Sequence, residues 1–222
     1  MITSPLLPHL AGYINGQWVD ADSGATAPVF NRATGEHLAD VPQMGEGEAR
    51  RAVDSAAAAM ASAPSAADRR RWLAAIAERL LAAKADLGRI ITLEHGKPLS
   101  ESATEVEYAA GFFRYFAEHL AALEPRPLPE KIRGCRWTVH HRPAGVAGLI
   151  TPWNFPLAML AKKLPAALAA GCASVAKPAG LTPLTAIVLW RVLEQAGLPA
   201  GMANLVIGDS GAIGRVLCTD PA

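Results

Sequence analysis

Asn154 is well placed in this sequence to donate a hydrogen bond to a reacting oxygen. It follows an apolar run at 146–150 and stands between Pro152 and Pro156. Because proline fixes φ, the two rings restrict the backbone around the amide. A carboxamide N–H held at the carboxyl end of a strand suits the stabilisation of an oxyanion. The alternative is a turn asparagine that caps the next helix, and Asn154 taken alone favours that alternative.

Lys177 occupies a similar position after a second apolar run, at 173–176. Its ammonium could bind ribose hydroxyls or a phosphate. A solvated loop lysine is the commoner role of any single lysine. The two residues gain weight together, because both follow strands whose carboxyl ends meet at one edge of a sheet, where ligands of such sheets bind.

The elements that must position these residues alternate between strand and helix. The predicted elements are strands at 146–150, 173–176 and 203–207, and helices at 156–170, with a break at Pro165, and at 184–196. This alternation predicts βαβ units and a parallel sheet with helices on both faces. The loops at 151–156 and 177–180 therefore matter most for function.

The N-terminal part has different patterns. Asn15-Gly16 between two apolar segments predicts a hairpin at 13–19, and further short strands are expected at 28–30 and 38–41. Three helices follow, at 46–63, from Pro64-Ser65 to the Gly96-Lys97-Pro98 stop, and at 100–123. The third helix carries aromatic residues at core spacing, which we interpret as buried core. These residues are Tyr108, Phe112, Phe113 and Phe116.

Composition excludes several classes of function. The 222 residues include 21 basic and 20 acidic side chains, so there is no basic stripe for nucleic acid and no polybasic patch for a membrane surface. The apolar stretches are too short to span a bilayer, and the N-terminus lacks signal-peptide features, so a cytoplasmic location is expected. The three cysteines are too scattered for a disulfide framework, and no Cys/His cluster has zinc spacing, so no metal site is expected.

Several segments, in their order and spacing, resemble the aldehyde dehydrogenase superfamily. The resemblance runs from about residue 12 to 222 and is closest to the succinate-semialdehyde dehydrogenase group. The segments that carry it are Ile150-Thr151-Pro152-Trp153-Asn154-Phe155-Pro156, the run from Pro165 to Cys172, Lys177-Pro178, Ala196 to Gly201, Tyr13 to Trp18, and Thr92 to Leu99.

The resemblance implies an α/β fold with a Rossmann-like, mostly parallel sheet, N-terminal helices and an oligomerisation arm. Residues 1–124 would supply the N-terminal strands and helices of the cofactor-binding domain. Residues 125–145, which open with a Pro-rich break, would form the arm, and residues 146–222 an incomplete nucleotide-binding βαβ core. Strand pairing between subunits would then give a homo-oligomer, a dimer or a tetramer.

The resemblance also implies roles for individual residues. Asn154 would be the side-chain half of the oxyanion hole for a hemithioacetal, and Lys177 would contact the adenosine ribose. The turn that contains Gly211 would pass near the adenine. The full set expected to bind NADP or NAD is Ile150, Pro152, Trp153, Lys177, Ala179, Gly180 and Gly211.

Two departures from the family pattern are informative. NAD-preferring relatives carry Glu at the position of Gly180, where a carboxylate would repel a 2′-phosphate, so its absence predicts use of NADP or of both cofactors. Lys162 stands where related semialdehyde enzymes often carry an Arg for the substrate carboxylate. Lysine offers a point charge without bidentate geometry, and it still suits a short acidic substrate such as succinate semialdehyde.

The family's nucleophile and general base have no match in this sequence. Cys135, Cys172 and Cys218 lie outside any such motif, and Cys172 is expected to be a small buried residue. The run from Gly208 to Gly214 has G-x-x-G-x-x-G spacing, which departs from the phosphate-binding fingerprint. We therefore expect the catalytic domain to be absent, with the missing motifs beyond Ala222 and no turnover by this chain alone.

Three functional hypotheses remain open at this point. The first is NAD(P)-dependent oxidation of an aldehyde, with succinate semialdehyde as the expected substrate, to the carboxylic acid. The second is a non-catalytic nucleotide-binding or subunit-docking remnant of such an enzyme. The third is a related enzyme that acts on another aldehyde, such as an aromatic or glutarate semialdehyde.

Overall fold

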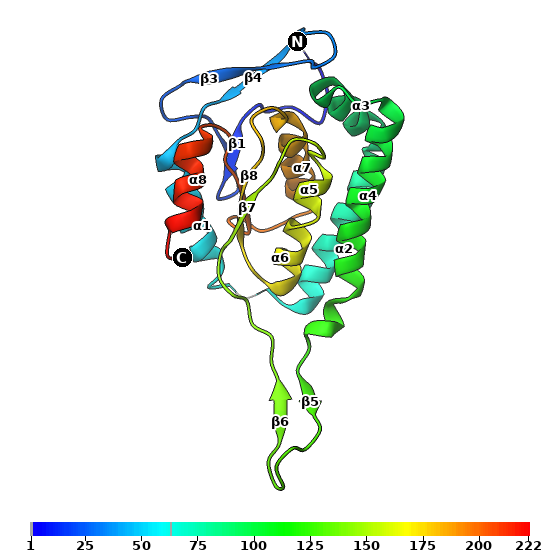
Figure 1. Cartoon of the computed structure of the whole chain (residues 1–222), viewed down its shortest axis with the longest axis vertical. Coiled ribbons are helices and arrows are strands. Elements are labelled where there is room, and N and C mark those ends of the chain that lie inside the picture. Colours follow the sequence, from blue (N-terminus) through cyan, green and yellow to red (C-terminus); the bar gives the residue numbers. More distant parts are fainter. Residues whose placement is uncertain (1, 63) are drawn as a thin grey trace.

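A computed structural model describes residues 2–62 and 64–222, and its centre is a five-stranded sheet (Figure 1). The strand order is β2-β1-β9-β8-β7. The strands are β1 (Gly12–Ile14), β2 (Gln17–Val19), β7 (Ala147–Ile150), β8 (Ser174–Lys177) and β9 (Ala203–Leu205). β7, β8 and β9 are parallel, whereas β1 and β2 complete the sheet as an antiparallel edge. The predicted α/β architecture is confirmed.

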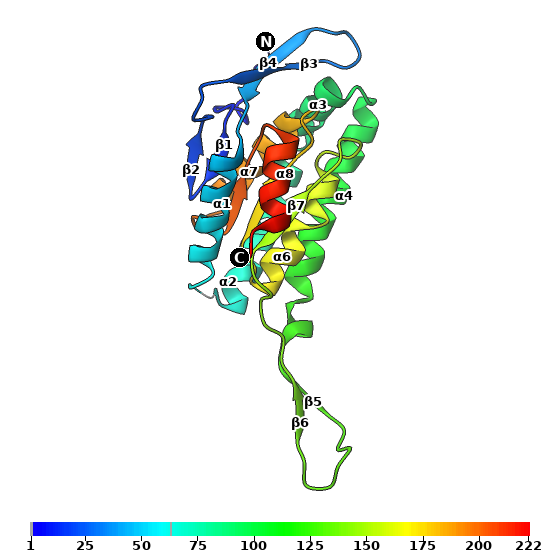
Figure 2. The same ribbon diagram turned by 60° about the vertical axis from the view of Figure 1, so that its left-hand side comes forward.

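Helices cover both faces of the sheet (Figures 1 and 2). One face contacts α1 (Glu46–Ala59) and α8 (Ser210–Thr219). The other contacts α6 (Leu164–Ala170) and α7 (Pro183–Gln195), and the short α5 (Ala158–Ala161) leads into α6. An outer layer packs on these helices, and it consists of α2 (Ala66–Ala82), α3 (Lys84–His95) and α4 (Leu99–Glu118).

The N-terminal strands follow the predicted pattern. β1 and β2 pair through a two-residue turn in which Asn15 and Gly16 have φ of 51° and 78°. Positive φ at both central residues is the type I′ geometry that Asn-Gly favours. A second antiparallel pair, β3 (Thr26–Phe30) with β4 (His37–Pro42), lies above one end of the sheet (Figure 1).

Helix boundaries depart from the predictions in three places. α1 ends at Ala59, and its predicted end at Ala63 lies outside the described residues. The expected single helix before Gly96 is two helices, α2 and α3, joined at Ala83. The predicted third helix ends at Glu118 and is followed by a 3-10 turn, η1 (Leu120–Leu123).

The break predicted at Pro165 is placed two to three residues too late. α5 ends at Ala161 and α6 begins at Leu164, so Pro165 lies in the first turn of the new helix. A proline is tolerated there because the first amides of a helix have no intrahelical acceptor. Pro165 therefore does not interrupt α6.

A hairpin projects from the body between α4 and β7 (Figure 2). Its strands are β5 (Arg126–Leu128) and β6 (Trp137–Val139), which pair antiparallel. Most residues from Glu124 to Arg142 are exposed, Trp137 among them. The segment predicted as an arm is thus an extended ribbon with little support from the rest of the chain.

The core lies between the sheet and the helices of its two faces. Trp190 of α7 is fully buried, and its indole Nε1 donates to the carbonyl of Ala203 in β9 at 3.1 Å. On the opposite face, Ala49, Ala52 and Ala56 are fully buried, and their small side chains let α1 approach the strands closely. Within the described residues, no helix combines the length and apolarity needed to cross a membrane.

Candidate functional site

The two loops singled out from the sequence lie side by side at one edge of the sheet. Ile150, the last residue of β7, is the register partner of Lys177, the last residue of β8. The amide of Thr151 then donates to the carbonyl of Lys177 at 3.2 Å. Because the strands are parallel, the loops that carry Asn154 and Lys177 leave the sheet in the same direction.

Asn154 is exposed within its loop, as are its neighbours Trp153 and Phe155. Leu157 stands at the N-cap of α5, three residues further along. The first amides of this helix are bound by a side chain from α4, since Oε1 of Glu105 accepts from the N–H of Leu157 at 2.9 Å and of Ala158 at 3.0 Å. Capping of α5 therefore does not need the Asn154 carboxamide.

Lys97 holds the same loop from the other side. Its Nζ donates to Oε2 of Glu105 at 2.7 Å and to the backbone carbonyl of Asn154 at 3.1 Å. The ammonium also lies 4.3 Å from the centroid of the Phe155 ring, a cation–π distance. Sequence reasoning missed this pair, because Gly96-Lys97-Pro98 reads as a helix stop. The position of Glu105 could have been noticed, because its spacing from Ser102, Val106 and Ala109 places a carboxylate on the buried side of α4.

A second carboxylate supports the loop after β8. Glu94, at the end of α3, accepts from the amides of Leu184 and Thr185, both at 2.8 Å, and from the Thr185 hydroxyl. These amides open α7. Complete burial raises the pKa of Glu94 to about 7, against the opposing effect of its hydrogen bonds to Thr185 and Leu184.

A small cavity separates the two loops. Its volume is about 250 Å³, and its lining comes from both loops, the end of α3 and the β3–β4 turn. The lining residues are Arg32, Glu94, His95, Trp153, Leu181 and Thr182. His95 lies 5.7 Å from Trp153 between ring centroids, and burial, reinforced by the nearby Lys97 ammonium, lowers its pKa. Asn154 and Lys177 do not line this cavity.

Lys177 is more enclosed than the sequence suggested. The residue is 4% exposed, and its Nζ donates to the carbonyl of Pro178 at 3.0 Å. Burial lowers its pKa, with a smaller opposing effect from Asp209. Ala179 and Gly180 follow at the surface, and a Cβ added to Gly180 would have no described heavy atom within 4 Å. A larger side chain would therefore fit at Gly180.

Gly211 lies in the first turn of α8, on the far side of the sheet from α7. Oδ1 of Asp209 accepts from the amides of Gly211 at 2.7 Å and Ala212 at 2.9 Å. These bonds lower the pKa of Asp209, which favours the carboxylate. The Asp209 carboxylate already occupies this helix terminus. A phosphate there would find the amides of Gly211 and Ala212 already bonded, and the negative charge of Asp209 would repel it.

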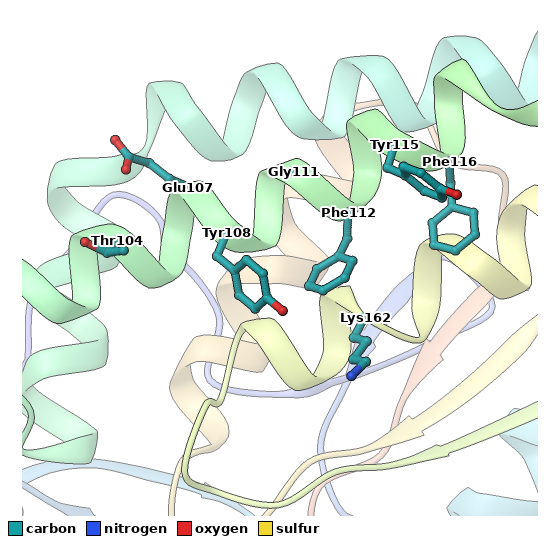
Figure 3. Close-up of a pocket in the computed structure, with 8 residues that line it drawn as sticks. All are labelled: Thr104, Glu107, Tyr108, Gly111, Phe112, Tyr115, Phe116 and Lys162. Carbon is teal, nitrogen blue, oxygen red and sulfur yellow. The ribbon is translucent and has the colours of Figure 1, made fainter.

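Lys162 lies beside a wide groove between α4 and α5 (Figure 3). The groove has a volume of about 740 Å³ and is lined mostly by aromatic side chains of α4. Its lining consists of Thr104, Glu107, Tyr108, Gly111, Phe112, Tyr115, Phe116 and Lys162. Lys162 is exposed at the border of this aromatic surface, and Figure 3 shows its ammonium pointing away from the Phe112 ring.

The groove corrects the interpretation of the aromatic stripe as core. Phe113 is fully buried as predicted, but Tyr108 is 54% exposed. Phe112 and Phe116 are half-buried and line the groove. The reason is geometric, because α4 turns the side of Val106, Ala109 and Phe113 towards the core. The remaining aromatic residues lie on an adjacent side of the helix, which the described residues leave open.

Among residues 2–62 and 64–222, neither a metal cluster nor a cysteine lies at this edge of the sheet. In the described ranges, no group of three or more His, Cys, Asp or Glu side chains is arranged to hold a metal ion. Cys172 is buried just before β8, as predicted, and Cys135 and Cys218 are exposed elsewhere. The chemistry that this edge offers is hydrogen bonding by the exposed carboxamide of Asn154, whose backbone is anchored by Lys97, together with an apolar surface.

A sheet of three parallel strands, extended by two antiparallel ones and covered by helices on both faces, defines an α/β protein of the class whose ligands bind at the carboxyl ends of the strands. The family model described as the aldehyde dehydrogenase family matches residues 18–222, and the chain belongs to that family. This confirms the resemblance that the motifs indicated.

Curated relatives include several semialdehyde dehydrogenases. Glutarate-semialdehyde dehydrogenase of Pseudomonas putida is 43% identical over 92% of this chain and 43% of its own length. The NADP(+) succinate-semialdehyde dehydrogenase GabD of Escherichia coli is 42% identical over 94% of this chain and 44% of its own length. The chain thus spans less than half of the length of these relatives.

Solved structures show the same fold. A crystal structure of an oxidoreductase from Marinobacter aquaeolei is 51% identical, with a TM-score of 0.96 over 100% of this chain and 47% of that one. Succinate-semialdehyde dehydrogenase from Burkholderia pseudomallei is 43% identical, with a TM-score of 0.94 over 99% of this chain and 46% of that one. Betaine aldehyde dehydrogenase from Staphylococcus aureus, solved with NAD+, is 31% identical, with a TM-score of 0.91 over 95% of this chain and 44% of that one.

Proposed function

We propose that this chain supplies the cofactor-binding side and one oxyanion donor of an NAD(P)-dependent aldehyde dehydrogenase that oxidises a short acidic semialdehyde. The observation that carries the proposal is the Asn154 loop. Its carboxamide is exposed at the carboxyl edge of the sheet, while its backbone is bonded to buried side chains of the α3–α4 corner. A donor held in this way favours developing negative charge on an aldehyde oxygen, because it needs no reorganisation during the reaction.

The surface beside Asn154 fits the apolar part of a dinucleotide. Ile150 and Trp153 are large apolar side chains that remain 46% and 51% exposed at the end of β7. Pro152 between them is also exposed. We assign these residues, with Lys177, Ala179, Gly180 and Gly211, to the cofactor cleft. The bound cofactor supplies a hydride acceptor, and the chain's own residues orient it and exclude water.

We propose that the cofactor is NADP, or both NADP and NAD. Gly180 leaves open space where a carboxylate would otherwise select against a 2′-phosphate. Lys177 brings a cation within the same loop, although its Nζ is bonded to Pro178. The relative from Escherichia coli is named for NADP(+) and the structure from Staphylococcus aureus contains NAD+, so family members include both kinds.

The substrate is proposed from Lys162 and its groove. A carboxylate at the far end of a short aldehyde would pair with this ammonium, while the aromatic wall of α4 excludes water around the carbon chain. Two relatives are named for glutarate and succinate semialdehydes, and both of these semialdehydes carry such a carboxylate. We propose this class of substrate, with succinate semialdehyde as the first to test.

Assembly is proposed from the β5–β6 hairpin. Its strands present unpaired edges and an exposed Trp137 away from the body. Exposed strand edges are commonly covered by pairing with another chain. We therefore propose that residues 125–145 join copies of this protein in a homo-oligomer.

The test is to express the complete reading frame that contains these 222 codons and follow NAD(P)H absorbance with succinate and glutarate semialdehydes. We expect turnover with an acidic semialdehyde, and we expect Asn154→Ala to lower kcat by about 10²- to 10³-fold, as for other oxyanion donors. Cofactor affinity, measured by fluorescence titration, serves as the control and should stay within twofold. Cofactor binding without turnover of any aldehyde would contradict the proposal and favour a non-catalytic remnant.

A further inference from the structure

The ion pair between Lys97 and Glu105 differs from the other ion pairs among the described residues. Its side chains are 7% and 0% exposed, whereas the other pairs lie at the surface. Removing two charges from water is costly, and an apolar pair of similar volume often gives equal or greater stability. Stability alone is therefore a weak reason for this pair, and its geometry has to be considered.

The remaining hydrogen bonds of the pair go to the loop after β7 and to the start of α5. Lys97 donates to the carbonyl of Asn154, and Glu105 accepts from the amides of Leu157 and Ala158. The two anchor points lie on opposite sides of Phe155-Pro156, and the Phe155 ring rests against the same ammonium. The loop is thus fixed immediately at Asn154 and again at the start of α5.

We propose that Lys97 and Glu105 are positioning residues that set the direction of the Asn154 carboxamide. This inference rests on the proposed function of Asn154 as an oxyanion donor. The side chains from Pro152 to Phe155 are exposed, so the geometry of this stretch depends on its backbone anchors. An oxyanion donor loses its advantage when it shifts by about 1 Å, which can cost about 10²-fold in rate.

Hydrogen exchange on this chain tests the anchoring directly. We expect Lys97→Met and Glu105→Leu, which each remove one set of anchors, to speed amide exchange in the peptide covering residues 152–160 by about tenfold or more. The matched control is Ser102→Ala. It removes a 2.9 Å bond to Thr92 between the same two helices, α3 and α4, without touching the loop. Lys97→Arg keeps the cation and should restore most of the protection.

Kinetics of the product of the complete reading frame test the consequence. We expect Lys97→Met to lower kcat about tenfold or more with KM for the cofactor within twofold, and Lys97→Arg to recover part of the loss. A fall in cofactor affinity equal to the fall in kcat would point to general damage and overturn the positioning role. The double variant Lys97→Met/Glu105→Leu, which buries no charge and removes both anchors, provides a folded sample for exchange if a single variant fails to fold.

The two proposals fail in different measurements. Unchanged kcat in Asn154→Ala overturns the proposed function. Unchanged exchange at 152–160 in Lys97→Met, or faster exchange spread evenly over the whole chain, overturns the positioning role.

Discussion

Two buried carboxylates support the two loops of the candidate site, and they differ in one respect. Glu105 and Glu94 each accept from two consecutive amides in the first turn of a helix that follows a functional loop. Glu105 is paired with Lys97, whereas the hydroxyl of Thr185 is the additional partner of Glu94. Burial raises the pKa of Glu94 to about 7, because hydrogen bonds alone do not offset the loss of water.

The comparison shows two ways to cap a helix inside a protein. With a cation beside it, as at Glu105, the carboxylate forms an ion pair that also bonds the neighbouring loop. Without a cation, as at Glu94, the pKa of the carboxyl group lies at about 7, so its charge changes with pH near neutrality. The Asn154 loop has the charged support, and the Lys177 loop has the titratable one.

The largest expected effect comes from removing the charged support. We expect Glu105→Ala to lower the free energy of unfolding of this chain by about 3–5 kcal/mol, because Lys97 is left buried without its partner. Urea denaturation followed by circular dichroism would measure it. The control is Lys97→Met/Glu105→Leu, which replaces the pair by apolar side chains and should recover most of the loss. A cost below about 1 kcal/mol for Glu105→Ala would show that the pair is not desolvated.

The raised pKa of Glu94 predicts that the free energy of unfolding depends on pH. The pKa of Glu94 is raised from 4.5 to about 7, so the folded chain binds this proton more tightly than the unfolded chain. Its contribution to stability is therefore fully present below pH 4.5 and is lost as pH rises through 7. At about 1.4 kcal/mol per pKa unit, the full loss is about 3 kcal/mol.

Urea denaturation of wild type and Glu94→Gln measures this contribution. The difference between their unfolding free energies should change by about 2–3 kcal/mol between pH 5 and pH 8, in the direction that disfavours wild type at high pH. Glutamine keeps an oxygen acceptor for the α7 amides but does not titrate. A difference that stays constant over this range would mean that Glu94 has an ordinary pKa.

Much of the sheet could be predicted from the sequence, because its signals are local. Asn15-Gly16 favours positive φ at both turn residues, and the apolar runs that end at Ile150 and Ala176 are each followed two residues later by a proline. The split of α2 from α3 at Ala83 has no such signal. Alanine, leucine and lysine favour helix on both sides, so packing of the outer layer decides where the chain turns.

The support of the site could not be read from the sequence in the same way. Periodicity places Glu105 on the buried side of α4, but it does not name the loop that the carboxylate meets. For the aromatic residues of the same helix other than Phe113, the spacing predicted burial that the structure does not show. Spacing predicted burial for Tyr108, yet the helix face that it shares with Phe112 opens onto the groove. A pattern identifies a face of a helix, whereas the contacts of that face depend on segments distant in the sequence.

The smallest expected effect is on the relative affinity for NADPH and NADH, and it distinguishes the role of the loop after β8 from that of the Asn154 loop. Gly180→Glu adds a carboxylate where the described structure leaves open space, so the fold should be unaffected. A charge there would weaken NADPH relative to NADH by about tenfold, or about 1.4 kcal/mol, through repulsion of the 2′-phosphate. Fluorescence titration of the complete reading frame's product with both cofactors would measure the ratio of the two affinities, and Gly180→Gln is the uncharged control.

If the two variants change this ratio equally, the size of the side chain and not its charge controls the choice between NADPH and NADH. The kcat should stay constant in both, because the Asn154 loop and its anchors lie on the neighbouring strand.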